Sequence, residues 1–356
     1  MRKKRILYFV EAFGGGVFTY IVNLANGLCD DFDVYVAYGV RKQTPKNFEK
    51  YFNNKVHLIH VENYQREISF KKDLAALHEM KKITARVQPD VIHLNSSKAG
   101  ILGRWLFRKS RLPIFYTPHG YSFLMQGISK KKQFFYKSLE NFFAFKNCET
   151  IACGPGEFEI TKELTSNATY VDNGINLKEF DGINMDHQTN FDHLKIATLG
   201  RISLQKNPVM FNRIAESFPN VDFIWIGDGE LRDKLTTPNI KVTGWVDNKT
   251  ALNYLADTDI FILTSLWEGL PMALLEAMYM KKICIVSDVV GNRDVIHDEQ
   301  NGYICDSVND FIKKVKSIST DRLMLPELIK KAHDDVVNHY NSTVMANEYK
   351  KIYTIK

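Results

Sequence analysis

Two glutamates stand eight positions apart in the stretch SLWEGLPMALLEAM (265–278). The apolar run DIFILTS (259–265) predicts a buried strand, so Glu268 falls in the loop that follows it. Pro271 suits the first position of a helix, where its missing N–H costs nothing, and Glu276 then lies roughly 7–8 Å further along the helix axis. The two carboxylates can accept hydrogen bonds from the two ends of one ligand, with phosphate at the helix start between them. A nucleotide-sugar has this length and this order of groups.

The alternative for this pair is structural. Two glutamates at this spacing are frequent by chance, and Glu268 could cap the helix start while Glu276 forms a surface ion pair. The strand, glycine, proline and apolar helix around them favour the binding site.

Three other strand ends carry candidate donor-binding groups. In LGRISLQKNP (199–208) the planar fork of Arg201 and the point charge of Lys206 suit a diphosphate. Close backbone approach is permitted by Gly227 and Gly229 in WIGDGELR (225–232). The turn after Trp245, at Val246, can offer main-chain groups to a nucleobase edge, although Trp245 could equally be a partly buried packing residue.

Near the N-terminus, Gly14, Gly15 and Gly16 follow a strand and precede a helix pattern, which lets an anion or a sugar hydroxyl approach the helix N–H groups, or simply makes a tight turn. This is not G-x-G-x-x-G, and the second strand DVYVAYGV (33–40) lacks the terminal acidic residue of a nicotinamide dehydrogenase. Two histidines also end strands. His119, before Gly120, is the stronger functional candidate. For His93 the more frequent role is that of a core histidine with its hydrogen bonds made within the protein, and Lys98 could simply lie on a solvent-exposed helix face.

The elements that must position these groups alternate between short apolar runs and helical patterns, which predicts β-α units and parallel sheets. The runs are RILYFV, DVYVAYG, VHLIHV, DVIHLN, PIFYTPHG and TIACG in the first half, and KIATLGR, VDFIWIGDG, IKVTGW, DIFILTS, KICIVSD and GYICD in the second. We expect an α/β protein of two doubly wound domains facing across a cleft, at residues 1–175 and 176–335. A final helical segment, 336–356, is expected to return to the first domain.

Composition narrows the function classes. The 356 residues can fill more than one core, no apolar run approaches ~20 residues and no signal peptide is evident, so a cytoplasmic protein is expected. Five cysteines without a C-x-x-C pair indicate neither a disulfide framework nor a zinc site. The net charge of +6 is concentrated in the first half, where a negatively charged partner would bind.

Taken together, the motifs resemble a family 4 retaining glycosyltransferase of the two-Rossmann-domain (GT-B) fold, of the kind that builds bacterial capsule, exopolysaccharide or O-antigen repeats. The resemblance covers essentially the whole chain. It rests on GGG (14–16), HLNSSKAG (93–100), TPHG (117–120), GRISLQKNP (200–208), GDGELR (227–232), EGLPMALLE (268–276) and GNRDVI (291–296).

The resemblance implies a sugar nucleotide, most simply a UDP-sugar, held mainly by the second domain. Arg201 and Lys206 would bind the diphosphate, Glu276 the ribose, and Glu268 with Gly269, Leu270 and Pro271 the donor sugar. On the first domain, Gly15 and Gly16 would lie against phosphate or acceptor, His119 beside the transferred sugar, and His93, Asn95 and Lys98 on the acceptor side. It implies front-face transfer of a hexose or N-acetylhexosamine with retention, with no cofactor and no active-site metal. Departures at Asn95, at Asn207 and in VDNGIN (171–176) affect acceptor and loop details.

The stretch ISKKKQFFYKSLENFFAFKNC (128–148) interleaves aromatic side chains with Lys130, Lys131, Lys132, Lys137 and Lys146. A basic aromatic helix can lie on an anionic bilayer, and the resemblance supports this, because many relatives extend lipid-diphosphate-linked saccharides at the inner membrane face. The alternative is that Phe134, Phe135, Leu139, Phe142 and Phe143 form an ordinary core face. No nucleic-acid-binding module is present.

Two competing functions remain open. A non-hydrolysing nucleotide-sugar epimerase shares the two-domain architecture but needs no acceptor. A non-catalytic subunit would bind a nucleotide-sugar, or partner an active transferase, without turnover. The donor sugar, the acceptor and the linkage are not specified by the motifs.

Overall fold

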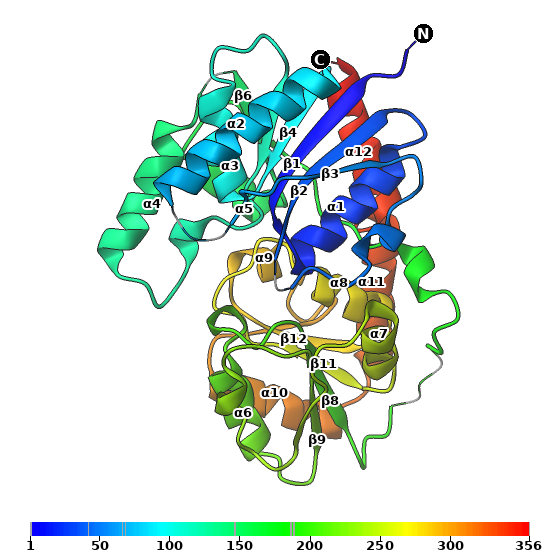
Figure 1. Cartoon of the computed structure of the whole chain (residues 1–356). Coiled ribbons are helices and arrows are strands. Elements are labelled where there is room, and N and C mark those ends of the chain that lie inside the picture. Colours follow the sequence, from blue (N-terminus) through cyan, green and yellow to red (C-terminus); the bar gives the residue numbers. More distant parts are fainter. Residues whose placement is uncertain are drawn as a thin grey trace. The chain divides into compact units, whose positions relative to one another are not determined.

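The computed structural model of the chain describes residues 2–41, 43–65, 67, 69–145, 147–185, 187 and 189–355. The chain forms two compact units. Unit 1 comprises Met1–Leu124, Ile128–Asn173 and Ser342–Lys356, and unit 2 comprises Met125–Gly127 and Gly174–Asn341. The last helix of the chain therefore belongs to unit 1 (Figure 1).

Unit 1 is built on a parallel sheet of seven strands in the order β3-β2-β1-β4-β5-β6-β7. The strands are β1 (Arg5–Phe13), β2 (Asp33–Val40), β3 (His57–His60), β4 (Val91–Asn95), β5 (Ile114–Thr117), β6 (Cys148–Ala152) and β7 (Ala168–Tyr170). Its helices are α1 (Gly15–Leu28), α2 (Phe70–Val87), α3 (Ser97–Leu106), α4 (Lys130–Phe142), α5 (Pro155–Lys162) and α12 (Ser342–Ile355), with short 3-10 turns η1 (Phe48–Tyr51) and η2 (Ser122–Leu124).

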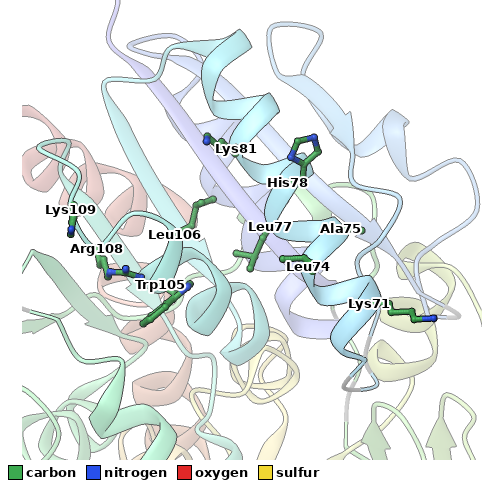
Figure 2. A pocket seen from close by; sticks show the side chains of 10 residues that line it. All are labelled: Lys71, Leu74, Ala75, Leu77, His78, Lys81, Trp105, Leu106, Arg108 and Lys109. Atoms are coloured by element: carbon green, nitrogen blue, oxygen red, sulfur yellow. The ribbon is translucent and has the colours of Figure 1, made fainter.

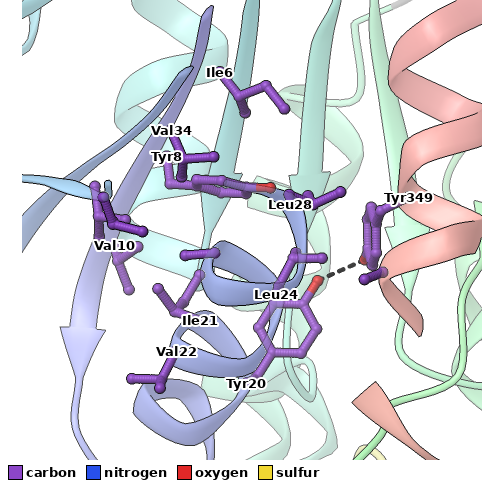
Figure 3. Close-up of a cluster of buried hydrophobic side chains, with 14 of the residues drawn as sticks. Ile6, Tyr8, Val10, Tyr20, Ile21, Val22, Leu24, Leu28, Val34 and Tyr349 are labelled. Atoms are coloured by element: carbon purple, nitrogen blue, oxygen red, sulfur yellow. Dashed lines mark hydrogen bonds between the residues drawn. The ribbon is translucent and has the colours of Figure 1, made fainter. Parts of the chain in front are cut away.

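Side chains that alternate along β1 feed two separate cores, one on each face of this sheet. Ile6, Tyr8 and Val10 pack with α1 and α12, whereas Leu7 and Phe9 pack on the face covered by α2 and α3. Figure 3 shows the first of these cores, in which the Tyr20 hydroxyl donates a hydrogen bond of 2.6 Å to the Tyr349 hydroxyl. Both faces are buried, so the strands read as apolar runs and not as alternating ones.

Unit 2 is built on a parallel six-stranded sheet in the order β10-β9-β8-β11-β12-β13. The strands are β8 (Lys195–Leu199), β9 (Asp222–Ile226), β10 (Ile240–Val242), β11 (Ile260–Leu263), β12 (Ile283–Ser287) and β13 (Tyr303–Cys305). The helices are α6 (Pro208–Glu216), α7 (Asn248–Ala256), α8 (Met272–Tyr279), α9 (Val290–Arg293), α10 (Val308–Thr320) and α11 (Leu325–Asn338), with turns η3 (Leu177–Phe180), η4 (Leu204–Lys206) and η5 (Arg232–Lys234).

These two sheets confirm the predicted fold class for each half of the chain. Among the described strands of unit 1, only β7, the three-residue edge strand Ala168–Tyr170, was not predicted from an apolar run. All five cysteines are buried free thiols. Among the described residues, no helix combines the length and the apolar character needed to span a membrane.

Candidate active site

The strand order of unit 2 contains one point at which the direction of winding reverses. From β8 the sheet continues to β9 and β10 on one side and to β11, β12 and β13 on the other, so the direction of winding reverses between β8 and β11. In open parallel sheets, ligands bind where the strands end at such a switch point. The loops after β8 (200–207) and β11 (264–271) meet there, and they hold Arg201, Lys206 and Glu268.

Glu268 is the centre of the hydrogen bonds that join these two loops. The residue is 8 % exposed, and its carboxylate accepts hydrogen bonds from Lys206 Nζ (2.7 Å), Ser265 Oγ (2.6 Å) and Gln205 Nε2 (3.2 Å). The loops are also joined through the main chain, since the Leu266 N–H donates to the carbonyl of Gln205. Glu268 is therefore not a helix cap, and its orientation is fixed by the loop after β8.

Pro271 is not at the first helical position, as the sequence suggests. It has extended backbone angles and stands at the N-cap, so α8 begins one residue later, at Met272. Its carbonyl accepts from the N–H groups of Leu274 and Leu275. The ring still fits this position, because a cap residue donates no intrahelical hydrogen bond of its own.

Glu276 lies buried on α8, 7 % exposed, and no described residue donates a hydrogen bond to its carboxylate. Its pKa is raised from 4.5 to about 8, chiefly by burial and also by the neighbouring Glu179 carboxylate, while Lys206 opposes the shift. Glu179, on η3, is half-buried, which raises its pKa, and it accepts a hydrogen bond of 2.5 Å from Asn248 Nδ2. A buried carboxylate without donors is costly unless a ligand supplies them.

Arg201 differs from Lys206 in its accessibility. Its Nε donates a 2.9 Å hydrogen bond to Glu230, and both side chains are partly exposed. An exposed pair of this kind contributes little to stability, so Arg201 can exchange its partner for another anion at small cost. Lys206 is held more tightly, because its pair with Glu268 is largely buried.

The glycines after β8 and β9 are required by close backbone packing. A Cβ on Gly227 would come within 2.3 Å of the Gly200 carbonyl oxygen, and one on Gly229 within 2.2 Å of the Ile202 carbonyl oxygen. The loop that contains Gly269 is packed as closely, since a Cβ on Gly291 would come within 1.7 Å of the Gly269 carbonyl oxygen. These contacts hold the loops after β8, β9 and β11 in fixed positions around the switch point.

The remaining donor-side candidates of unit 2 differ in exposure. Trp245 is 61 % exposed in the loop after β10, so it is not a packing residue. Val246 beside it is half-buried. Leu270 is buried, which leaves its main chain as the part that could face a ligand.

In unit 1, Gly15 and Gly16 are exposed at the start of α1, whose N-cap Gly14 offers no side-chain hydrogen bond. Gly15 has a φ of 56°, a left-handed conformation that favours glycine, and nothing lies within 4 Å of where its Cβ would be. The first turn of α1 contains no acidic side chain. Its N–H groups are therefore open to an anion or to a hydroxyl oxygen.

His119 occupies a strained position after β5, with a φ of 55°. Its Nε2 lies 3.0 Å from Asn95 Oδ1, and because the Asn95 amide nitrogen donates to the His93 carbonyl, that oxygen is an acceptor and the proton is on Nε2. Burial lowers the pKa of His119 to about 3, so the imidazole is neutral. The turn is held by Glu157, whose carboxylate accepts from the N–H groups of Gly120 (2.6 Å) and Cys153 (2.8 Å).

The three acceptor-side candidates are less accessible. His93 is fully buried, and its ring nitrogens contact the Tyr353 hydroxyl (2.5 Å) and Thr117 Oγ1 (2.8 Å). Asn95 is also fully buried and contacts His119. Lys98 forms an ion pair with Asp73 and donates to two main-chain carbonyls of the loop before α2. Asn95 thus contacts His119 directly and His93 contacts Thr117, two residues before it, whereas Lys98 holds the loop before α2.

Comparison with known proteins identifies the family. The model of "Glycosyltransferase Family 4" matches residues 14–179, and that of "Glycosyl transferases group 1" matches residues 195–321. A protein of Escherichia coli named UDP-Gal:alpha-D-GlcNAc-diphosphoundecaprenol alpha-1,3-galactosyltransferase is 31% identical over 337 residues, which cover 85% of this chain and 85% of the relative. The chain belongs to glycosyltransferase family 4.

Solved structures agree with this family's GT-B fold. Sucrose-phosphate synthase from Thermosynechococcus elongatus superposes with a TM-score of 0.84 at 16% identity, over 99% of both chains. The Anabaena protein HepE in complex with UDP-glucose superposes with a TM-score of 0.78 at 15% identity, over 99% of this chain and 100% of that one. At such identities the likeness concerns the fold.

Several site residues of this glycosyltransferase were missed by sequence reasoning. Gln205 and Ser265 lie inside the motifs and flank the predicted Lys206 and Glu268, so their proximity could have been found from the same loops. Glu179 and Glu157 lie outside every motif used for the site. Glu179 lies near Glu276 in unit 2, and Glu157 holds the His119 turn in unit 1, only through tertiary packing, for which the sequence carries no local signal.

Proposed function

We propose that this glycosyltransferase moves a hexose or N-acetylhexosamine from a UDP-sugar to a lipid-diphosphate-linked saccharide, with retention of anomeric configuration, in the synthesis of a bacterial surface polysaccharide. The observation that carries the proposal is the group of side chains at the switch point of unit 2, where buried Glu276 has no hydrogen-bond donor among the described residues and Lys206 is held against Glu268. The printed name of the Escherichia coli relative supports both the donor and the acceptor class.

In this proposal Glu276 accepts hydrogen bonds from the ribose hydroxyls, which would supply the donors that its carboxylate lacks. Arg201 and Lys206 bind the diphosphate, and Glu268 with the main chain of Gly269 and Leu270 binds the donor sugar. Trp245 and Val246 contribute to the nucleobase side. The exposed pair of Arg201 with Glu230 supports the role of Arg201, because the guanidinium can turn from a carboxylate to a phosphate at little cost.

Unit 1 would supply the groups nearest the reacting sugar. The open N-terminus of α1 at Gly15 and Gly16 would meet phosphate or acceptor, and neutral His119 would contact the transferred sugar. Asn95 would act by holding that histidine, and His93 by holding Thr117 two residues before it, since both are buried. Lys98 would act on the acceptor side through the loop before α2, to which it is already bound.

The reaction would break the bond between the anomeric carbon and the diphosphate oxygen and form a bond from the same face to the acceptor oxygen. The proton of the acceptor hydroxyl would pass to the departing phosphate oxygen. Arg201 and Lys206 would stabilise the negative charge that grows on the leaving diphosphate, so that the chain's own cations could serve without a metal ion. No covalent intermediate with a carboxylate is required.

A peripheral contact with an anionic membrane would bring the lipid-linked acceptor to the enzyme. On α4 the aromatic side chains of Phe134, Phe135 and Phe142 are 75%, 51% and 65% exposed, so they are not the core face of an ordinary helix. Lys130, Lys131 and Lys132 are exposed beside them. Lys146, also predicted for this surface, lies outside the described residues. An exposed basic and aromatic helix supports contact with anionic lipid at the inner face of the membrane.

A thermal-shift panel of UDP, GDP, ADP and their sugar conjugates tests the donor side, because a ligand that binds only the folded chain raises its melting temperature. We expect a shift with UDP and one or more UDP-sugars that is lost in Glu276→Ala. Transfer from the sugar conjugate to a GlcNAc-diphospho-lipid then tests the acceptor. Transfer with inversion of the anomeric configuration would contradict the proposal, as would binding of a UDP-sugar without any transfer.

A further inference from the structure

A shallow hollow of about 720 Å³ lies on unit 1 between α2 and the C-terminal part of α3 (Figure 2). Its apolar part comes from Leu74, Leu77, Leu106 and Trp105. Two of these side chains are well exposed for their size, Leu74 at 58% and Trp105 at 43%. Exposed aliphatic and aromatic side chains that gather in one hollow are more informative than scattered ones, because contiguous apolar surface marks an interaction site.

The rim of the hollow is cationic. Lys71, Lys81, Arg108 and Lys109 line it together with His78, and no acidic side chain is among the described residues that do so. None of these four cations forms an ion pair with a described residue. Arg108 instead stacks on Trp105, with its guanidinium carbon 3.8 Å from the ring centroid. The hollow therefore combines apolar surface with positive charge that no nearby carboxylate neutralises.

The acidic side chains of the same helix are engaged elsewhere, which explains the excess charge. On α2, Asp73 pairs with Lys98 at 2.7 Å and also accepts from the Ser69 N–H. Glu79 accepts a hydrogen bond from Asn63. On α3, Arg104 is neutralised by buried Glu140, so this arginine does not add to the rim. The carboxylates of α2 thus hold neighbouring loops and leave its lysines free.

The shape and chemistry fit an amphiphilic anion. From Lys71 to Lys81 the rim extends about 15 Å along α2 at ~1.5 Å per residue, which accommodates a hydrocarbon chain better than a compact ligand. The leucines favour a saturated or branched chain over a nucleobase, which would need several stacking aromatic rings. The lysines and Arg108 favour a phosphate headgroup.

The hollow is continuous with the aromatic end of α4. Trp105 contacts Phe143 edge-on, with ring centroids 6.2 Å apart, and Phe143 contacts the exposed Phe142 at 5.1 Å. Lys81 lies in the second half of α2, and Arg108 and Lys109 follow the end of α3, so these three rim cations lie toward the edge of the sheet where its parallel strands begin. Gly15 and His119 follow the carboxyl ends of β1 and β5, at the opposite edge. A lipid headgroup bound by these three cations would belong to the bilayer and not to a diphosphate in transfer.

We propose that this α2–α3 hollow takes an acyl chain of an anionic phospholipid from the bilayer, its phosphate bound by the rim cations, as a second anchor beside α4. This rests on the membrane contact of the proposed function. The hollow would fix the rotation of unit 1 on the membrane, which the single helix α4 cannot do, because a lone helix allows the unit to turn about its axis.

Fluorescence quenching tests the hollow directly. The full chain is mixed with phosphatidylcholine vesicles that contain phosphatidylglycerol with brominated acyl chains, which quench a tryptophan they touch. We expect quenching that Trp105→Phe removes and that Trp245→Phe, a change at another exposed tryptophan, leaves in place. Equal quenching of wild type and Trp105→Phe would overturn the proposal, since contact would then not reach the hollow.

Vesicle binding of further variants tests the cationic rim and the apolar surface of the hollow separately. Lys81→Gln and Lys109→Gln should each weaken binding to phosphatidylglycerol vesicles about fivefold at low salt, as expected for one basic residue near an anionic surface. Leu74→Gln should weaken it at high salt too, whereas Leu323→Gln, an exposed leucine of unit 2, should not. Equal binding to neutral vesicles, or equal loss with both leucine variants, would overturn the proposal.

Two further probes separate other occupants. Farnesyl diphosphate that protects Trp105 while phosphatidylglycerol does not would assign the hollow to the acceptor and overturn the bilayer source. An oligonucleotide that binds through Lys81 and Lys109, with no vesicle binding, would overturn it as well. A chain that binds UDP but no vesicles contradicts only the membrane contact and the hollow; one that binds vesicles through the hollow but no UDP contradicts only the proposed reaction.

Discussion

Lys206 Nζ lies 2.7 Å from Glu268 Oε1, and the pair joins the loops after β8 and β11 at the point where the sheet of unit 2 reverses its winding. The same lysine lowers the pKa of Glu276, against the raising effects of burial and Glu179. One cation thus acts on both glutamates of the eight-residue spacing. A ligand diphosphate at this point would compete with Glu268 for Lys206 and would change the surroundings of Glu276.

Lys206→Ala should lower kcat by about 100-fold to 1,000-fold, the range for removing one preorganised group that stabilises developing negative charge. The loss should fall on kcat more than on KM for the donor, because charge grows on the leaving diphosphate during the reaction. Steady-state kinetics with the UDP-sugar from the thermal-shift panel measures both constants.

Lys234→Ala is the matched control for that prediction. Lys234 also pairs with a carboxylate in unit 2, that of Asp233, but on an exposed turn outside the switch point. Its removal should leave kcat and KM unchanged. Near-normal turnover of Lys206→Ala would refute the assigned role of the lysine.

Glu276→Gln should make the free protein more stable at alkaline pH. In the unfolded chain this carboxyl loses its proton near pH 4.5, whereas burial keeps it protonated in the folded chain until about pH 8. The folded state therefore binds more protons between these values, and its stability falls as pH rises through that window. Glutamine carries no such titration, so the variant should gain on the order of 3 kcal/mol relative to wild type between pH 5 and pH 8.

Urea unfolding of the ligand-free chain across this pH range measures the effect. Glu327→Gln, at an exposed position in the first turn of α11, should follow the wild-type curve. Parallel curves for wild type and Glu276→Gln would mean that Glu276 is not buried as a neutral group. The stabilised variant should at the same time lose affinity for UDP if its carboxylate binds the ribose.

The fold was predictable because nearly every strand has the same local signature. The runs that form β1, β8 and β11 are apolar on both faces, which in a chain with intervening helices indicates a covered parallel sheet. β7 was not predicted because it is a three-residue edge strand, Ala168–Tyr170, that is not buried and has no apolar run. Its pairing with β6 is decided by the sheet and not by its own composition.

The candidate site was predictable only as far as its groups lie within motifs. Arg201, Lys206, Glu268 and Glu276 stand at strand ends or on the following helix, and parallel topology brings those positions to one edge. Glu179 could not be found this way, because η3 reaches Glu276 from a loop without a strand signal. His93 illustrates the reverse case, a motif histidine that is buried among tyrosines of α12.

His119→Gly and His119→Ala should separate strain from function. Both remove the imidazole, and both should reduce transfer about tenfold to 100-fold if the ring contacts the sugar as proposed. Only alanine keeps a Cβ at a φ of 55°, which costs roughly 1–2 kcal/mol in the left-handed region. The glycine variant should therefore unfold at higher urea concentration than the alanine variant. Equal midpoints would show that the positive φ is not imposed by the surrounding structure.

Glu140→Ala should destabilise unit 1 by about 3–5 kcal/mol, because it leaves the buried Arg104 without its partner. The two groups are 2.6 Å apart and almost fully buried, and Glu140 also accepts from the Tyr116 hydroxyl at 3.1 Å. Glu140 is the only fully buried residue among the described residues of α4, so its ion pair is a main attachment of this helix to the unit, beside the half-buried Tyr136 that packs against the core.

Glu163→Ala provides the comparison, because Glu163, which follows α5, pairs with Lys137 of α4 at an exposed position. That pair should contribute less than about 1 kcal/mol. Amide hydrogen exchange of α4 should therefore accelerate strongly in Glu140→Ala and little in Glu163→Ala, while exchange in α1 and α12 stays closer to wild type. Similar exchange in both variants would mean that the exposed aromatic residues of α4 have packing partners within the unit, and the membrane contact proposed for them would lose its structural basis.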